Sequence, residues 1–396
     1  MAGTAIVTAR PSVVFVLPDK MGGLASIIAN LLHHRTADEF DYRAILTHNR
    51  RDPDTRLLQR LDADTQVVEY AMPIENLYTV VRRLRRAIGA GRGVLVCNDF
   101  VEMLLVTLID PGRTVIQILH GDSDYYYELA SVHAPLVHAF VAYSRVVYEK
   151  LLERLPHRRD TIFWLPYGVS IPAVVRQPST PSLRLIFVGR LDEAKGVLAL
   201  PEIDRLLRVA AVPVSWTVVG SGPAGPAMRE AWHDAGHVRW VETATPADVI
   251  ALCASHDVLV LPTRAEGLSV ATVEAMSAGV VPVVSDLPSM GELVDDGRTG
   301  LRVPAADVHA FAEAIAGLSR DRDRLEQMSV AARRLVIGRF DIVTRAAAYQ
   351  SLFARWQELH RPRPASPVKS YGSRLDRPWL PNTVVRLVRS AIRSAR

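Results

Sequence analysis

The chain has 396 residues, of which 49% are hydrophobic and 22% charged, so it is long enough for two hydrophobic cores and lacks the composition of a disordered protein. Its two cysteines, Cys97 and Cys253, indicate neither a disulfide framework nor a clustered zinc site, and a reducing cytoplasm fits best. The net charge of +5 belongs to the tail, because residues 361–396 hold nine Arg or Lys and one acid and the rest carries −3. This distribution argues against nucleic acid as a partner.

The N-terminal stretch MAGTAIVTARPSVVFVLPDK has Arg10 inside its apolar part and runs into a strand pattern, so we expect no signal peptide. No apolar run reaches the roughly 18 residues that a membrane-spanning helix needs. We therefore expect a cytoplasmic protein that would meet a membrane only at its surface.

Apolar strand patterns alternate with helical patterns along the first half of the chain. The strand patterns are SVVFVLP, YRAILTH, TQVVEY, GVLVCND, TVIQILHG, HAFVAYS and TIFWLPYGV. One helix is expected from Gly22, one between YRAILTH and TQVVEY, and one through Arg86. This alternation is typical of βαβ units around a parallel sheet.

A segment without periodicity, AVVRQPSTPS at residues 173–182, reads as a linker. The alternation then restarts with LRLIFVGR, SWTVVGSG, VRWVE, DVLVLPT, VVPVVSD and TGLRV. The fold class is therefore α/β, with two doubly wound domains in tandem. Ligands of such sheets bind beyond the carboxyl ends of the strands, so the loops after these strands are the places to look for chemistry.

The domain boundaries follow from these patterns. We expect Rossmann-like domains over residues 1–172 and 183–340, joined by the linker at 173–182. A helix over 341–360 could return to the first domain, and a basic tail occupies 361–396.

Within the tail, Arg386, Arg389, Arg393 and Arg396 share an arc of about 80° at the helical period, with apolar residues opposite. Such a helix could lie in an anionic membrane surface or dock on the body with its arginines in water, and the sequence leaves both open.

The sequence VVGSGPAG has the GxGxxG spacing of a dinucleotide-binding loop, with Gly220 as its first glycine and Glu242 at the end of the next strand. However, this loop follows the second strand of its domain, whereas the fingerprint belongs to the first. Pro223 and Pro226 also surround the expected helix start. An NAD- or FAD-binding oxidoreductase therefore stays only as an alternative.

The loop VGRLDEAKG carries Arg190 and Lys195 at the carboxyl end of a strand, where two cations can hold a diphosphate. The next relevant strand, DVLVLPT, leads through Glu266 to Ser269, the expected N-cap of a helix that contains Glu274. Free amides at that helix start suit an anionic group, and glutamates accept hydrogen bonds from sugar hydroxyls. A ligand that carries a diphosphate together with hydroxyl groups on both sides of it is a nucleotide sugar.

Three segments, Phe187–Gly196, Val218–Pro223 and Leu261–Gly300, resemble the donor-binding domain of the GT-B glycosyltransferases of family 4. The resemblance covers roughly 183–340 and is weaker in the first half, at Met21–Leu24, His120–Gly121 and Pro166–Val169. It implies two Rossmann-like domains facing across a cleft, and retaining transfer of a sugar from a nucleotide-sugar donor to an acceptor hydroxyl. It further implies no bound metal or other cofactor, and a place in polysaccharide or glycolipid and glycoconjugate biosynthesis.

The resemblance also implies roles for particular residues. Arg190 and Lys195 would stabilise the departing diphosphate, Glu274 would accept from the ribose hydroxyls, and Glu266 would hold the donor sugar with the amides of Gly267, Leu268 and Ser269. Gly220 belongs to the second of the matching motifs.

In the first domain, which would bind the acceptor, Gly22 and Gly23 would let a loop approach the phosphates. His120 matches an acceptor-side histidine and would hydrogen-bond the sugar or the acceptor. The family's common Phe-Gly is Leu268–Ser269 here, and its usual glutamate is missing near Ser26.

Alternatives to this hypothesis are a nucleotide-sugar epimerase of the same fold and a non-catalytic sugar-nucleotide-binding protein. The Asp122-x-Asp124 pattern, which would suggest a metal-dependent enzyme of another fold, recurs at three other places and so carries little information. The basic tail and the arginines of VVRRLRRAIGAGR favour a membrane-linked acceptor and an anionic membrane surface as a partner, on the inner face of the cell membrane.

Overall fold

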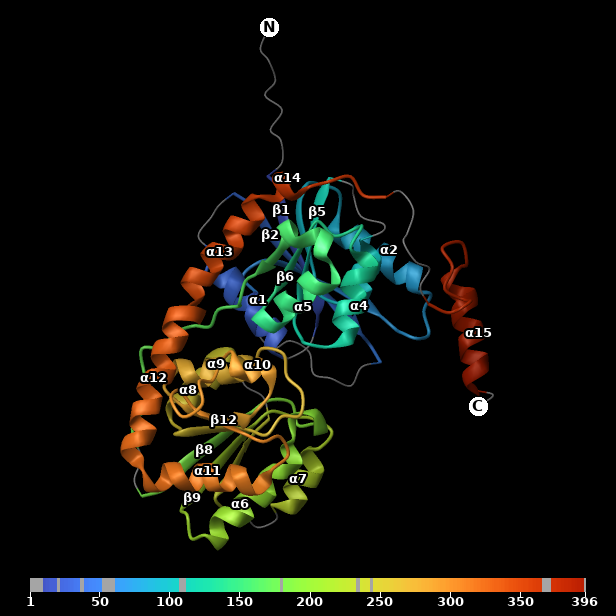
Figure 1. Cartoon of the computed structure of the whole chain (residues 1–396). Helices are drawn as coiled ribbons and strands as arrows, with labels where there is room; N and C mark the ends of the chain where they lie inside the picture. The colour runs from blue at the N-terminus through green and yellow to red at the C-terminus, as the bar shows by residue number, and fades with distance from the viewer. Residues whose placement is uncertain are drawn as a thin grey trace. The chain divides into compact units, whose positions relative to one another are not determined.

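The structure is a computed structural model, and it describes residues 10–19, 22–35, 39–51, 61–106, 112–178, 181–232, 236–242, 245–364 and 372–394. The chain forms two compact units (Figure 1). The first unit consists of Met1–Tyr143, Val147–Leu165 and Ala346–Arg396, and the second of Ser144–Val146 and Pro166–Arg345.

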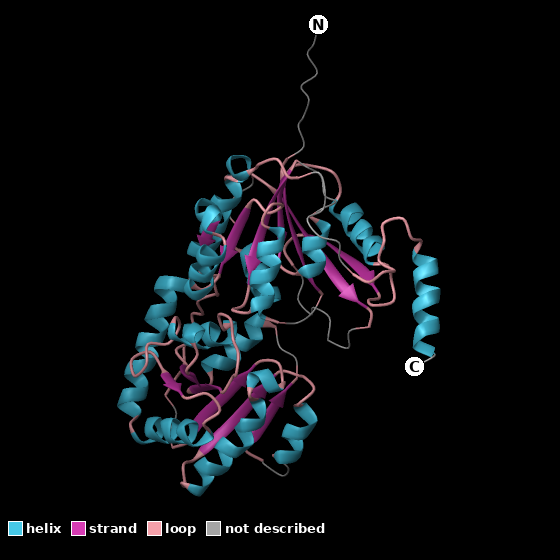
Figure 2. Cartoon of the chain, turned by 45° about the vertical axis from the view of Figure 1, so that its right-hand side comes forward, coloured by secondary structure: helices cyan, strands magenta, loops and turns pink. Residues whose placement is uncertain are grey.

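The first unit is built on a seven-stranded parallel sheet in the order β3-β2-β1-β4-β5-β6-β7 (Figure 2). Its strands are β1 (Ser12–Pro18), β2 (Asp41–Asn49), β3 (Asp64–Tyr70), β4 (Gly93–Cys97), β5 (Arg113–Leu119), β6 (Ala139–Ala142) and β7 (Ile162–Trp164). All seven expected strands are confirmed. β4, β5 and β6 are buried along their whole length, as parallel strands covered on both faces are.

Helices connect these strands. They are α1 (Gly23–His33), α2 (Leu77–Ile88), α3 (Phe100–Leu105), α4 (Asp124–His133), α5 (Arg145–Arg154) and η1 (Pro156–Thr161). The helix expected between β2 and β3 falls largely on residues 52–60, outside the described part of the chain.

The second unit has a six-stranded parallel sheet in the order β10-β9-β8-β11-β12-β13. Its strands are β8 (Leu183–Val188), β9 (Val214–Val219), β10 (Val238–Val241), β11 (Val258–Leu261), β12 (Val281–Ser285) and β13 (Leu301–Val303), again as the sequence predicts. Its helices are η2 (Glu193–Lys195), η3 (Val197–Ala199), α6 (Leu200–Val209), α7 (Gly225–Ala231), α8 (Pro246–Ala254), α9 (Val270–Ser277), α10 (Pro288–Gly291), α11 (Val308–Arg320) and α12 (Arg322–Phe340).

In both sheets the strand order reverses beside the first strand, between β1 and β4 and between β8 and β11. At such a reversal, the connections leaving the two neighbouring strands run to opposite faces of the sheet and leave a crevice at the carboxyl ends. The α/β class with two doubly wound domains is thereby confirmed, and the loops after these strands are the candidate site.

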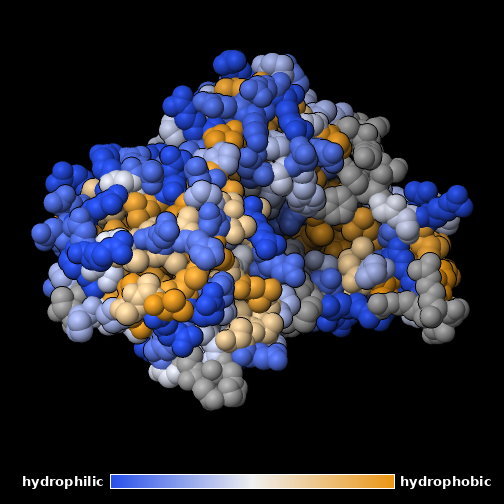
Figure 3. All heavy atoms as spheres, turned by 60° about the horizontal axis from the view of Figure 1, so that its bottom comes forward, coloured by the Kyte–Doolittle hydropathy of each residue, from blue (hydrophilic) through white to orange (hydrophobic). Residues whose placement is uncertain are grey.

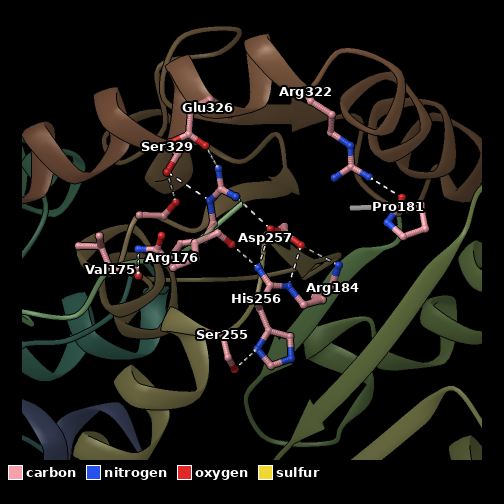
Figure 4. A network of polar contacts seen from close by, with 12 residues as sticks. Val175, Arg176, Pro181, Arg184, Ser255, His256, Asp257, Arg322, Glu326 and Ser329 are labelled. Atoms are coloured by element: carbon pink, nitrogen blue, oxygen red, sulfur yellow. Dashed lines mark hydrogen bonds and ion pairs between the residues drawn. The ribbon is translucent and has the colours of Figure 1, made fainter. Parts of the chain in front are cut away.

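The described part of the segment 173–182 is held within the second unit by a buried ion cluster (Figure 4). Arg176 donates to Asp257 over 2.9 Å and to the Ser329 hydroxyl over 3.3 Å, and it also pairs with Glu326. Arg184 binds the same fully buried Asp257. Between Leu165 and Pro166 the chain passes from the first unit to the second, which is earlier in the sequence than the expected linker.

The segment after α12 returns to the first unit. α13 (Ile342–Ala354) starts in the second unit, and from Ala346 onward the chain belongs to the first, including α14 (Trp356–Leu359) and α15 (Asn382–Ser394). The Phe353 ring packs edge-on against Phe15 of β1 with centroids 5.9 Å apart, and Thr114 of β5 donates to the Trp356 carbonyl over 2.7 Å. No helix among the described residues is long and apolar enough to cross a bilayer.

Candidate functional site

Three loops of the second unit leave neighbouring strand ends and meet at one edge of the sheet. Gly220 follows β9, Arg190 and Lys195 follow β8, and Glu266 follows β11. Because β9, β8 and β11 are adjacent and parallel, their carboxyl ends share an edge. The structure thus brings together loops that are separated in sequence by dozens of residues.

Two glycines let these loops touch through their backbones. Gly196 has φ +66°, and a Cβ there would lie 1.9 Å from the Pro262 carbonyl oxygen. Gly220 has φ +135°, and a Cβ there would lie 1.9 Å from the Gly189 carbonyl oxygen. A side chain is impossible at either position without moving the backbone. Close packing of loops therefore accounts for Gly220, without a bound dinucleotide.

The two candidate cations each contact a carboxylate. The Lys195 ammonium forms an ion pair with Glu266 of the β11 loop. The Arg190 guanidinium lies 3.2 Å from one oxygen of Asp192, whose other oxygen accepts from the Lys195 amide over 3.0 Å. Asp192 caps the short turn η2 and so fixes where Lys195 leaves the backbone. The capping role of Asp192 was not predicted from the sequence, where its position between Arg190 and Lys195 was the one available signal.

The loop after β11 is held from several sides. Its Thr263 hydroxyl and Arg264 amide both donate to the Ala194 carbonyl, over 3.0 and 2.8 Å, which joins it to the β8 loop. The Ser289 hydroxyl donates to the Glu266 carbonyl over 2.9 Å. Tyr167 donates through its hydroxyl to the carbonyl of Leu268, whose side chain is buried. The loop is therefore positioned before any ligand arrives.

Ser269 is the N-cap of α9, as predicted, and its hydroxyl accepts from the Thr272 amide over 3.3 Å. The N–H groups of the first turn of α9, directly after Ser269, have no acceptor within the helix by geometry. These N–H groups and the positive end of the helix dipole together suit an anion.

Glu274 lies in the second turn of α9 and is only 4% exposed. Its Oε1 atom has no hydrogen-bond partner among the described residues. Burial raises the pKa of its carboxyl to about 8. The pKa of the buried Cys253 thiol on α8 is also raised, by burial first and then by the Glu274 charge. An uncompensated buried carboxyl is costly, so this position favours a ligand that supplies the missing partner.

In the first unit, His120 follows β5 and is bound by Asn98, which follows β4. The Asn98 amide nitrogen donates to the Val16 carbonyl of β1 over 2.7 Å, and its oxygen lies 2.7 Å from Nε2 of His120. A carbonyl only accepts, so this arrangement places the His120 proton on Nε2. Burial lowers the pKa of His120 to about 3, which keeps the ring neutral. Its Nδ1 is then a buried acceptor without a partner among the described residues.

Asn98 is itself positioned by Glu102 of α3. The carboxylate of Glu102 accepts from the amide of Asn98 and, over 2.9 Å, from that of Asp99. Burial raises the pKa of Glu102 well above its usual range. Sequence reasoning missed Asn98 and Glu102, although a polar residue directly after the buried run GVLVC was a usable signal.

Gly22 and Gly23 lie after β1, at the start of α1. Gly22 has φ +154°, and a Cβ there would meet no atom of the described residues within 4 Å. Lys20 and Met21 are outside the described residues. Since β1, β4 and β5 are consecutive in the sheet, Gly22, Asn98 and His120 follow neighbouring strand ends of the first unit.

The Asp122-x-Asp124 pair is engaged in ion pairs. Asp122 accepts from Lys150 over 2.8 Å and from the Tyr127 hydroxyl over 2.7 Å, while Asp124 pairs with Arg154 over 2.6 Å. Within the described ranges, no group of three or more His, Cys, Asp or Glu side chains lies where it could hold a metal ion.

Solved structures share this fold. HepE of Anabaena in complex with UDP-glucose matches with a TM-score of 0.71 at 16% identity, and the match covers 87% of this chain and 99% of that chain. The protein therefore has the GT-B fold of two doubly wound domains.

Residues 182–321 match the family described as glycosyl transferases group 1. Over this stretch the chain is similar to that family. A protein of Salmonella typhimurium with the name "Putative colanic acid biosynthesis glycosyltransferase WcaL" is 34% identical over 178 residues, which are 42% of this chain and 43% of the relative. The GDP-mannose-dependent alpha-(1-6)-phosphatidylinositol monomannoside mannosyltransferase of Mycobacterium tuberculosis is 33% identical over 177 residues, 41% of this chain and 45% of the relative. The chain thus spans less than half the length of these curated relatives.

Proposed function

We propose that the protein is a retaining glycosyltransferase that moves a sugar from a nucleotide-sugar donor to an acceptor hydroxyl. The observation that carries this proposal is the convergence of Lys195, Glu266 and Arg190 at adjoining strand ends of a group 1 glycosyltransferase domain. Its relatives are named as glycosyltransferases, and the HepE structure contains UDP-glucose.

The donor would bind in the second domain. Arg190 and Lys195 would contact the diphosphate, and the amides of Gly267, Leu268 and Ser269 would add the field of the α9 N-terminus. Glu266 would accept from the donor sugar. An ammonium has three N–H groups, so Lys195 can keep Glu266 in place while it donates to a phosphate oxygen.

Glu274 would accept from the ribose hydroxyls, which would end the isolation of its buried Oε1. Gly220 would act by letting the β9 loop approach the β8 loop closely, so its contribution to donor binding is through the backbone.

The acceptor would bind in the first domain. A neutral His120 offers an acceptor lone pair at Nδ1, so its role would be a hydrogen bond from a sugar or acceptor hydroxyl. Gly22 and Gly23 would leave room for the donor phosphates at the start of α1.

In the chemical step, the bond from the anomeric carbon to the diphosphate oxygen would break, and a bond from that carbon to the acceptor oxygen would form on the same face. The acceptor proton would pass to the departing phosphate oxygen, so no further reactant is needed. Catalysis would consist of positioning, together with stabilisation of the negative charge on the diphosphate by Arg190 and Lys195.

We further propose a cytoplasmic location and a lipid-linked acceptor at an anionic membrane surface on the inner face of the cell membrane. Support comes from the basic residues of α2 and the tail, and from a relative that is named for a phosphatidylinositol mannoside.

The test is a thermal-shift panel of nucleoside diphosphates and their sugars, followed by transfer assays with the best donor. A nucleotide at a hundred times its Kd stabilises the folded state by about 2.7 kcal/mol, which is a readily measured rise in melting temperature. No response to any activated sugar would overturn the proposal. Appearance of an isomerised sugar without an acceptor would assign the protein to the epimerases.

A further inference from the structure

The basic tail is docked on the first unit by polar contacts at the start of α2. Asp376 accepts from the Leu77 amide over 2.8 Å, and Asn382 accepts from the Asn76 amide over 2.8 Å. The Arg389 guanidinium lies 2.6 Å from both the Asp376 carboxylate and the Glu75 carbonyl. These contacts fix the rotation of α15 about its own axis. Arg389 is thus mostly covered and held in an ion pair.

The contacts use one stripe of α15 and leave its apolar side outward. Asn382, Val385 and Arg389 face the body, and Val385 is fully buried. On the outward side Leu387 is 72% exposed, and Val384 and Val388 are exposed as well. Ile392, close to Val385 at the helical period, and Trp379, which precedes α15, are also exposed. We call these five exposed apolar residues the tail face.

The surroundings of the tail face are positively charged. Residues 372–394 contain five arginines and one acid, and α2 contains four arginines and no acid. The single acid, Asp376, forms an ion pair with Arg389. The exposed arginines are Arg386 on α15 and Arg82, Arg85 and Arg86 on α2. Arg82 reaches the tail by donating to the Pro378 carbonyl. At the right-hand edge of Figure 3, where α15 lies in Figure 1, hydrophobic and hydrophilic side chains reach the surface together.

We propose that the tail face inserts into the interface of an anionic lipid bilayer, with the first unit held behind α15. A second copy of the chain would bring two basic surfaces together, which is electrostatically unfavourable. An anionic bilayer matches both properties, because it accepts apolar side chains at headgroup depth and attracts the flanking arginines. This inference goes beyond the proposed membrane partner by naming the element that enters the lipid.

The experiment is co-sedimentation of the full chain with vesicles of phosphatidylcholine, with and without phosphatidylglycerol. Leu387→Ser should weaken binding to the anionic vesicles by about tenfold, because the leucine then no longer transfers from water to lipid. Arg386→Glu should weaken it by about tenfold or more at low salt, because each arginine near the surface contributes about a fivefold gain. Val209→Ser on α6, where the valine is 75% exposed, and Arg334→Glu on α12 are the matched controls and should bind normally.

Leu387 and Arg386 are both exposed, so both variants should keep the melting temperature of the unaltered protein. Equal binding of Leu387→Ser and the Val209→Ser control would overturn the proposal, as would absence of binding to anionic vesicles or equal binding to neutral ones. A change of oligomeric state in Leu387→Ser, without vesicle binding, would assign the tail face to a second copy instead. The assay uses no sugar and no turnover, so its failure would leave the proposed glycosyl transfer standing.

Discussion

Glu274 gives a quantitative prediction, because its burial couples nucleotide binding to a proton. With a pKa of about 8, its carboxyl is protonated in about nine molecules of ten at pH 7. If the carboxylate accepts from ribose hydroxyls, the bound nucleotide stabilises the charged form and lowers this pKa. Binding should then release close to one proton at pH 7, and affinity should rise up to tenfold per pH unit until the pH approaches 8.

The assay is calorimetry of nucleoside diphosphate binding in buffers that differ in their heat of ionisation. The slope of observed heat against buffer heat gives the number of protons released. Glu274→Gln is the matched control, since an amide has nearly the same size and does not titrate. It should release fewer protons and bind with an affinity that depends less on pH, because only the nucleotide's own terminal phosphate then titrates in this range. Equal proton release and equal pH dependence in Glu274→Gln and the unaltered protein would refute the reasoning.

The same group affects stability with a definite sign. Its pKa is raised in the folded protein, so its favourable contribution is complete below the unfolded pKa and is lost as the pH rises towards 8. The loss amounts to at most about 1.4 kcal/mol per pH unit. The melting temperature of Glu274→Gln should therefore fall less than that of the unaltered protein on going from weakly acidic to alkaline buffer.

Three further substitutions test the site. Lys195→Ala should lower kcat by about 10²–10³-fold while changing the nucleotide Kd much less, measured by transfer assay and calorimetry, and equal turnover would defeat its assignment to the leaving group. Asn98→Ala should slow transfer by about tenfold and add little to His120→Ala in the double variant, because both act through one hydrogen bond; independent, additive losses would contradict this. Gly196→Ala should lower the free energy of unfolding by several kcal/mol in urea titrations, because its Cβ would clash with the Pro262 carbonyl. Gly317→Ala, on α11 where no described atom is near, should raise it by about 0.5–1 kcal/mol. An unchanged free energy of unfolding in Gly196→Ala would show that the backbone can move away from Pro262 without cost.

Much of the fold could be predicted because parallel strands buried on both faces are continuous apolar runs. The runs GVLVC and LRLIFV predicted β4 and β8 in this way. The order of the strands in each sheet could not be predicted from such runs, because strand pairing depends on contacts between segments distant in sequence. The GxGxxG spacing at Gly220 shows the same limit, since spacing does not reveal that the missing side chain faces Gly189.

Some parts of the candidate site could likewise be predicted from the sequence, and others could not. The loops after β8 and β11 were predictable from their position, and so was the Ser269 cap. The ion pair between Lys195 and Glu266 was not, because it requires β8 and β11 to be neighbours. In the tail, periodicity predicted the helix, but the choice of Arg389 as a docking residue depends on Asp376 and Glu75 in three dimensions.

The first unit is completed by the C-terminal segment Ala346–Arg396, so its folding depends on the part of the chain that is synthesised last. A ribosome releases β1 to β7 early, yet Phe353, which packs on Phe15, and Trp356, which binds Thr114, emerge only after the whole second unit. Until then the nascent first sheet lacks part of its apolar cover, which invites chaperone binding or aggregation. Premature termination near residue 345 should consequently damage the N-terminal half of the protein more than the half in which it occurs.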